Sequence, residues 1–170
     1  HRNCMIGSNS ASIISDAYIK GVRDFDVNVL FEAMLKNSNN EGPMESVGRA
    51  GVKEYNELGY VPYDIGVNEN AARTLEYAYD DFTIAQLGKA LKKPEEEIAV
   101  FTQRAHNYKN VFDPSTKLMR GRNKDGEFQS PFNPFKWGDA FTEGNSWHYT
   151  WSVFQDVNGL AMAMGGRDTM

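Results

Sequence analysis

The sequence has 170 residues, of which 41% are hydrophobic and 24% are charged. This is an ordinary globular composition, long enough for one domain with a hydrophobic core. A net charge of −5 argues against a nucleic-acid partner, because no basic stripe is present to meet a phosphate backbone. No apolar run reaches the roughly 20 residues of a membrane span, and no secretion signal is visible. The single cysteine, Cys4, leaves the redox compartment open.

Hydrophobic residues at helical spacing predict six helices, bounded by Ser, Asp and Asn caps and by Gly or Pro stops. The expected helices run from Ser10 to Gly21, from Asp24 or Asp26 to Asn37, from near Ser46 to Gly59, from about Ala71 to Leu91, from Pro94 to Phe112, and from Asn145 or Ser146 to Gly165.

The helix expected at residues 71–91 has apolar groups on two sides, with Leu75 on one and Ile84 on the other. A helix that is apolar on more than one face packs on more than one face. We therefore expect it to be central, with Asn68 or Asn70 as its N-cap.

In the second half of the chain, two segments with helical spacing flank one segment without it. The helix after Pro94 has one buried face that includes Tyr108 and Phe112. Residues 118–134 show no helical period, and Asp125-Gly126 predicts a hairpin turn within them. In the last helix, the residues expected to point inward are Trp147, Thr150 or Trp151, Phe154, Val157 and Ala161.

These elements predict an all-α fold of antiparallel helix pairs with long loops and almost no strand. Broadly apolar helices alternate with one-faced helices, which suits a toroid of inner and outer helices. In such a toroid the loops between helices gather at one end and can form a site.

The stretch from Phe141 to Tyr149 places a carboxylate, Glu143, beside Trp147, His148 and Tyr149. Aromatic faces stack on sugar rings, and carboxyl groups exchange protons with glycosidic oxygens, so this combination is typical of carbohydrate chemistry. The alternative is that Glu143 is only a helix-entry residue. A helix N-terminus favours the carboxylate, whereas a general acid must hold its proton. Burial among Phe141, Trp147 and Trp137 would favour the protonated form.

A series of motifs covers nearly the whole chain in a fixed order: Cys4–Gly7, Asp16–Gly21, Gly59–Asp64, Thr74–Asp81, Arg104–Asp113, Met119–Asn123 and Phe141–Trp147. Together these motifs resemble glycoside hydrolase family 92, the calcium-dependent exo-acting α-mannosidases. One departure is Asn9, which stands where the family commonly has His and which puts a sugar contact from this loop in doubt.

The resemblance implies that residues 1–170 are a single partial domain, an internal piece of a catalytic (α/α)6 barrel. It implies inverting hydrolysis of terminal α-mannosidic linkages, with Glu143 as the general acid. The general base and the calcium-contacting motifs of the family would lie downstream, so calcium belongs to the parent enzyme and this piece alone would be inactive. The implied partners are mannose-containing glycans of unspecified linkage, met by a periplasmic or extracellular parent protein.

Five further side chains are candidate substrate contacts: Trp147, Asp16, Asp81, Asp64 and His148. Asp16 and Asp64 can hold either a sugar hydroxyl or a backbone N–H. Asp80 and Asp81 point about 100° apart on a helix, so at most one of them is expected to face a substrate, and both can instead pair with neighbouring helices.

His148 can line a pocket, although a hydrogen-bonded structural role is the more common one for a lone histidine. Arg120 and Arg122 can fix a carboxylate or, as we favour, hold the loop around Gly121. No His, Cys or Asp cluster has the spacing of a transition-metal site or of a calcium-binding loop, so no metal ligand is assigned.

The competing hypothesis is a non-catalytic helical module that binds glycans or a protein. For either function, a partial barrel exposes apolar helix faces that would normally meet neighbours, so self-association through these edges is expected.

Overall fold

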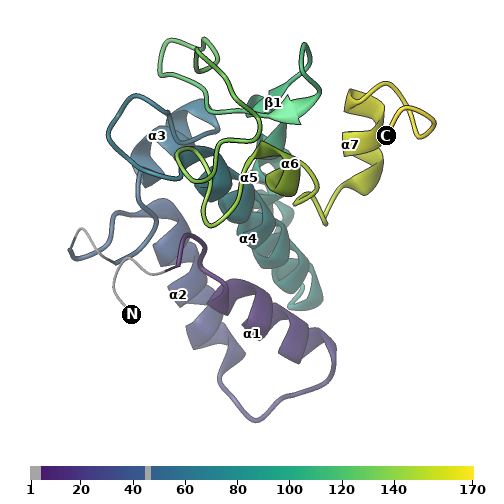
Figure 1. Ribbon diagram of the computed structural model, residues 1–170. Helices are drawn as coiled ribbons and strands as arrows, with labels where there is room; N and C mark the ends of the chain where they lie inside the picture. The colour runs from purple at the N-terminus through teal and green to yellow at the C-terminus, as the bar shows by residue number, and fades with distance from the viewer. Residues whose placement is uncertain (1–4, 45–46) are drawn as a thin grey trace.

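The computed structural model describes residues 5–44 and 47–170, and Cys4 and Ser46 lie outside them. The described chain is mostly helical, as predicted, with one small hairpin (Figure 1). The elements are α1 (Ser10–Ile19), α2 (Val27–Asn39), α3 (Val52–Leu58), α4 (Asn70–Ala90), α5 (Glu95–Arg104), the 3₁₀ helix η1 (Asn107–Asn110), β1 (Phe112–Asp113), β2 (Leu118–Met119), α6 (Ser146–Tyr149) and α7 (Val157–Ala163).

Helix α4 is the centre of the molecule, which confirms the prediction made from its two apolar sides. It contacts α1, α2, α5 and η1. Its first half, around Leu75, joins a core that includes Met119 and Phe141 from the later loops. Its second half, around Ile84, joins a separate core with α1, α2 and α5. Figure 1 accordingly shows α1 and α2 at one end of α4, and the loops between β2 and α6 at the other.

Two predicted helix ends are confirmed by their capping geometry. The Asp26 carboxylate accepts hydrogen bonds from the backbone N–H groups of Asn28 and Val29, both at 3.1 Å, and so caps α2. Gly59 ends α3 in the left-handed conformation with φ of 80°, a conformation that glycine adopts without steric cost.

The N-terminus of α4 differs from the prediction, since neither Asn68 nor Asn70 caps it. Glu69 occupies the N-cap position with φ of 60° and makes no side-chain cap. Loop carbonyls satisfy the helix end instead: Glu69 N–H donates to Asp139 O, and Ala72 N–H donates to Ala140 O, both at 3.0 Å. The start of α4 is therefore tied to the loop that precedes Glu143.

The helix expected between Pro94 and Phe112 ends at Arg104, which makes the second part of that prediction wrong. Tyr108 and Phe112 are buried as their spacing indicated. However, Phe112 pairs with Met119 in the small hairpin, and Arg120 N–H donates to Val111 O at 2.8 Å. These strand contacts with residues later in the chain replace the last helical turns.

The expected last helix is two short helices, α6 and α7, separated by residues 150–156. Asp156 starts the second helix because its carboxylate accepts from Gly159 N–H at 2.9 Å. Thr150 and Ala161 are buried, but Trp147, Phe154 and Val157, which were expected to point inward, are exposed. Their predicted burial is therefore wrong for the chain as it stands.

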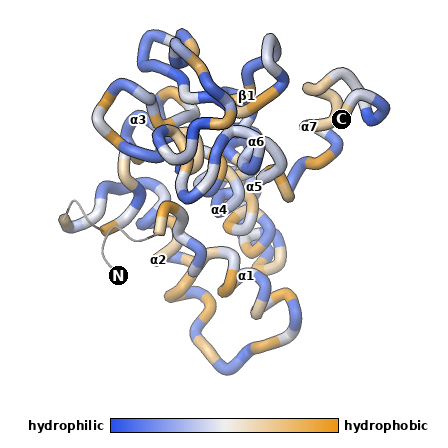
Figure 2. The backbone as a smooth tube through the Cα atoms, in the orientation of Figure 1, coloured by the Kyte–Doolittle hydropathy of each residue, from blue (hydrophilic) through white to orange (hydrophobic). Residues whose placement is uncertain are grey.

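The Asp125-Gly126 turn is confirmed. Arg122 and Phe128 form an antiparallel bridge across it, and Gly126 has φ of 94°. Figure 2 shows polar and apolar residues intermixed along the helices. None of the described helices is long and apolar enough to cross a membrane.

Candidate active site

Glu143 lies on a tight loop, residues 138–144, which closes on itself. Gly138 N–H donates to Gly144 O at 2.8 Å, and Phe141 N–H donates to Gly138 O at 3.2 Å. Glu143 itself has φ of 46°, in the left-handed region that non-glycine residues rarely occupy. Such a conformation costs on the order of 1–3 kcal/mol and persists only where the surroundings fix it.

The Glu143 side chain is exposed and is not buried among Phe141, Trp137 and Trp147. Phe141 is buried, but Trp137 and Trp147 are 65% and 45% exposed. The two tryptophans pair with other rings instead of closing over the carboxyl group. Trp147 stacks on Phe135 with ring centroids 6.2 Å apart, and Trp137 meets His148 edge-on at 5.9 Å. The Glu143 carboxyl group is therefore exposed, in a segment of the chain that also exposes Trp137 and Trp147.

The helix after Glu143 begins at Ser146 with Asn145 as its N-cap, which confirms one of the two caps predicted for it. His148 closes a reciprocal cap: its Nδ1 accepts from Asn145 N–H at 3.2 Å, and its own N–H donates to Asn145 Oδ1 at 3.3 Å. Because Nδ1 is an acceptor, Nε2 carries the proton of the neutral ring and is available as a donor.

Asp81 lies in the interior with both oxygens engaged. It accepts from Arg49 Nη1 at 2.7 Å and from the Tyr55 hydroxyl at 3.1 Å. Asp80 is equally buried and accepts from Ser8 N–H at 2.8 Å. This placement speaks against a substrate contact from Asp81 and agrees with the alternative of pairing inside the fold.

Asp16 and Asp64 also engage protein groups. Asp16 forms an exposed ion pair with Lys20, the C-cap residue of α1, at 2.8 Å. Asp64 accepts from Lys124 N–H at 2.8 Å and so fixes the Asp125-Gly126 turn, which is the backbone role considered above.

Arg120 and Arg122 hold the loops on either side of Gly121. Arg120 Nη1 pairs with Asp113 at 2.9 Å, and its Nε donates to Gln129 O at 2.7 Å. Arg122 Nε donates to the Gly126 carbonyl at 2.7 Å. The two arginines thus order the loop region that leads to residues 138–144.

Asp139 is a site-forming residue that the sequence did not single out. It accepts from Tyr63 Oη at 3.0 Å, from Gln129 Nε2 at 2.9 Å and from Lys136 Nζ at 2.9 Å. Burial alone would raise the pKa of Asp139, but these hydrogen bonds outweigh it and hold the pKa below its usual range. The sequence signal for Asp139 was the pair Gly138-Asp139 shortly before Glu143. Such a pair is typical of a tight turn, because Asp tolerates the left-handed backbone that Asp139 adopts.

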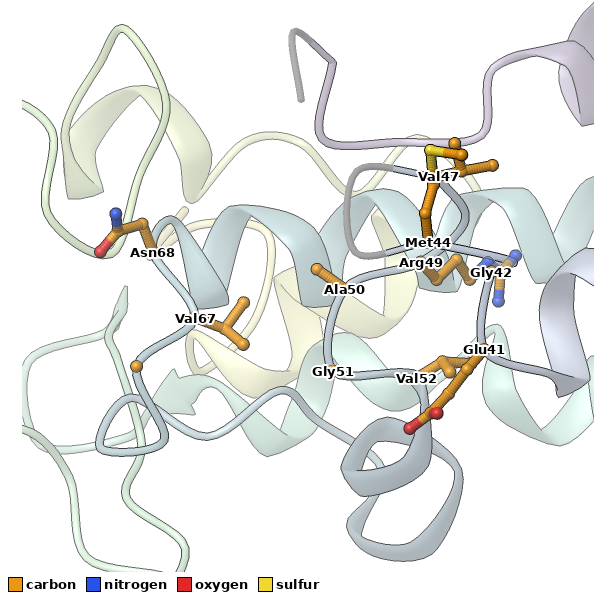
Figure 3. A pocket seen from close by; sticks show the side chains of 11 residues that line it. Glu41, Gly42, Met44, Val47, Arg49, Ala50, Gly51, Val52, Val67 and Asn68 are labelled. Atoms are coloured by element: carbon orange, nitrogen blue, oxygen red, sulfur yellow. The ribbon is translucent and has the colours of Figure 1, made fainter. Parts of the chain in front are cut away.

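A hollow of about 410 Å³ lies elsewhere, lined by residues from 41–44, 47–52 and 66–68 (Figure 3). Its charged lining residues are Glu41 and Arg49, and it contains none of the predicted site residues. Within residues 5–44 and 47–170, no group of three or more His, Cys, Asp or Glu side chains could hold a metal ion.

A family model of the glycosyl hydrolase family 92 catalytic domain matches residues 1–170. The chain belongs to this family. A family 92 inverting mannosidase from Bacteroides thetaiotaomicron is 42% identical and superposes with a TM-score of 0.93, over 99% of this chain and 23% of that structure. A family 92 α-mannosidase of the same organism, solved in complex with mannoimidazole, is 39% identical with a TM-score of 0.84, over 93% of this chain and 21% of that structure.

Among curated proteins, an uncharacterized secreted glycosidase of Arthroderma benhamiae is 35% identical over 95% of this chain. The chain spans 25% of the length of that relative. The chain is therefore similar to only a part of each of these relatives.

Proposed function

We propose that this chain is part of a family 92 α-mannosidase and that Glu143 is its general acid. The supporting observation is the position of Glu143: an exposed carboxyl group on a hydrogen-bonded loop, in a chain 42% identical to an inverting mannosidase. The alternative role of Glu143, as a residue that only starts a helix, is not needed here. Asn145 and His148 already cap α6 without Glu143.

In the proposed reaction, Glu143 donates its proton to the glycosidic oxygen as the C1–O bond breaks. A water molecule attacks C1 from the opposite face and loses a proton to the general base, which inverts the anomeric centre. The two carboxyl groups must be roughly 6.5–9.5 Å apart to admit this water. We assign the base to the part of the parent protein outside these 170 residues.

The proposed substrate is a glycan with a terminal α-linked mannose. Trp147, which is partly exposed, offers a ring face, and His148 offers its Nε2–H, both within five residues of Glu143 in the sequence. Asp16, Asp64 and Asp81 are left out of this contact set because each already binds a group of the protein.

Calcium does not fit the residues described here, since they bring together no set of carboxylate or imidazole ligands. We therefore place the ligands of a calcium ion in another part of the parent protein and derive no step through it.

The chain is one partial domain of a larger (α/α)6 barrel in this proposal. The exposed side chains of Phe154, Val157 and Met162 on and beside α7 would pack against the remaining helices of the barrel. We also propose that the parent protein is secreted, as the name of the fungal relative states for that protein.

The test compares Glu143→Gln with the unchanged full-length parent enzyme on two aryl α-mannosides. A 4-methylumbelliferyl group needs protonation to leave, whereas a 2,4-dinitrophenyl group does not. We expect kcat to fall about 10²–10⁴-fold on the first substrate, the usual contribution of a general acid, and much less on the second. Unchanged hydrolysis of both substrates would refute the acid role and would favour a glycan-binding module.

A further inference from the structure

The backbone on both sides of Glu143 is fixed by hydrogen bonds from outside the residue. The carbonyl of Thr142, directly before it, accepts from the Tyr149 hydroxyl at 2.8 Å. The carbonyl of Gly144, directly after it, accepts from Gly138 N–H at 2.8 Å. The peptide plane between Thr142 and Glu143 therefore cannot turn without losing a hydrogen bond, and the plane between Gly144 and Asn145 is held in the same way.

The ring of Tyr149 adds two contacts to the same loop. It stacks on Phe141 with ring centroids 5.4 Å apart and an interplanar angle of 29°. It also lies against Gly144, where an added Cβ would come within 3.2 Å of Tyr149 Cε2. Tyr149 thus touches Phe141, Thr142 and Gly144, the residues on both sides of Glu143.

Tyr149 is itself held in place by α6. The helix is attached to β2 through Ser146, whose hydroxyl donates to Met119 O, and through Thr150, whose Oγ1 accepts from Met119 N–H at 2.9 Å. Burial raises the pKa of the half-buried Tyr149 hydroxyl, which keeps it a proton donor at neutral pH. The connection runs from β2 through α6 and Tyr149 to the Glu143 loop.

This connection accounts for the left-handed backbone of Glu143. A non-glycine residue with φ of 46° relaxes unless its neighbours prevent it. The Tyr149 hydroxyl holds the carbonyl immediately before that strained residue. Without it, the peptide between Thr142 and Glu143 is free to rotate, and the carboxyl group moves with it.

We propose that Tyr149 is a positioning residue that holds the Glu143 carboxyl group where it can reach the glycosidic oxygen. This inference rests on the acid role proposed for Glu143. It concerns geometry and not binding, because Tyr149 acts through the backbone of the loop.

The test is Tyr149→Phe in the full-length parent enzyme, with the same two aryl α-mannosides. Phenylalanine keeps the ring contacts and removes only the hydroxyl. A misplacement of about 1 Å costs on the order of 10²-fold. We therefore expect kcat to fall about 10–100-fold for the 4-methylumbelliferyl substrate and less than about 3-fold for the 2,4-dinitrophenyl substrate, with KM nearly unchanged.

Tyr77→Phe is the matched control. The Tyr77 hydroxyl also donates to a backbone carbonyl, that of Ala50, at 3.1 Å, but it makes no described hydrogen bond with residues 138–144. This variant loses the same kind of hydrogen bond, and both substrates should be hydrolysed at the unchanged rate.

Glu143→Gln, measured in parallel, separates the two claims. Suppose that the loss of kcat in Glu143→Gln depends on the leaving group but Tyr149→Phe lowers kcat equally for both substrates. Tyr149 is then only structural, and the inference is overturned. If Tyr149→Phe leaves both rates unchanged, the inference is likewise overturned. If Glu143→Gln itself shows no dependence on the leaving group, the acid role fails, and the positioning role fails with it.

Discussion

Asp80 and Asp81 are adjacent, fully buried carboxyl groups whose surroundings differ. Asp81 has both oxygens engaged by Arg49 and Tyr55. Asp80 receives one backbone hydrogen bond from Ser8, and its Oδ1 has no hydrogen-bond partner among the described residues. Burial raises the pKa of Asp80 to about 7, although the Arg49 charge and the Ser8 N–H oppose the rise. Asp80 is therefore an internal group that titrates near neutral pH.

The raised pKa predicts a pH-dependent stability. A group that binds its proton more tightly when folded contributes stability below its unfolded pKa, near 3.8, and loses that contribution as the pH rises to about 7. Asp80→Asn cannot titrate. We therefore compare the unfolding free energy of the unchanged chain with that of Asp80→Asn. Relative to the variant, the unchanged chain should lose on the order of a few kcal/mol of this free energy between pH 4 and pH 8. Urea titrations at both pH values measure this difference.

The comparison with a variant is needed because Asp113, Asp139 and Asp156 act in the opposite direction. Hydrogen bonds hold the pKa of each of these groups below its usual range, so their contribution is lost as the pH falls. Asp168→Asn, at an exposed position, is the control for removal of a carboxylate. A stability difference for Asp80→Asn that stays constant with pH would contradict the prediction.

At the scale of elements, the Asp156 carboxylate links α7 to the rest of the molecule beside the buried Leu160 and Met164. Asp156 accepts from Tyr108 Oη at 2.8 Å and from Gly159 N–H at 2.9 Å, and it lies 3.2 Å from His106 Nδ1. Asp156→Ala removes the helix cap and the tertiary contacts together. We expect a loss of about 2–3 kcal/mol, with faster hydrogen exchange in α7.

Asp26→Ala is the matched control, because Asp26 caps α2 with two backbone hydrogen bonds but makes no tertiary contact among the hydrogen bonds described. Loss of a cap alone costs about 1 kcal/mol. Equal losses for Asp156→Ala and Asp26→Ala would show that the contacts with Tyr108 and His106 do not hold α7.

The elements that the sequence predicted well are those whose causes are local. Asp26 caps the residues next to it, and the apolar sides of α4 are visible in its own sequence. The misplaced ends depend on distant partners. Asp139 and Ala140 carbonyls satisfy the start of α4, and Met119 draws Phe112 into a hairpin. A single-sequence pattern carries no information about which distant carbonyl will be near.

The candidate site also has features that depend on nearby residues and features that depend on distant ones. Glu143, His148 and Trp147 are candidates from the sequence alone because they are close together and chemically distinctive. The exposure of Glu143 and the role of Asp139 could not be read from spacing, because both depend on how residues 138–144 fold against Tyr63 and Gln129. Asp81 resembled a site residue, but its partner Arg49 lies 32 positions away.

At the scale of the whole molecule, α7 stands apart from the helices around α4 (Figure 1). Its surroundings carry some of the most exposed apolar side chains of the described chain, with Phe154 at 72% and Met162 at 76% exposure. Exposed apolar surface of this kind usually meets another protein surface. In the parent protein this partner is proposed to be the rest of the barrel, and in the isolated chain the available partner is a second copy.

The isolated 170-residue chain should therefore self-associate as its concentration rises, as measured by multi-angle light scattering. The double variant Phe154→Ser and Met162→Ser lowers the apolar area beside α7 and should shift the association to higher concentration. Ile13→Ser, at a residue of α1 that is 69% exposed, controls for loss of apolar surface at the other end of the molecule. A monodisperse monomer at high concentration would contradict self-association, and an equal effect of both changes would contradict the involvement of α7.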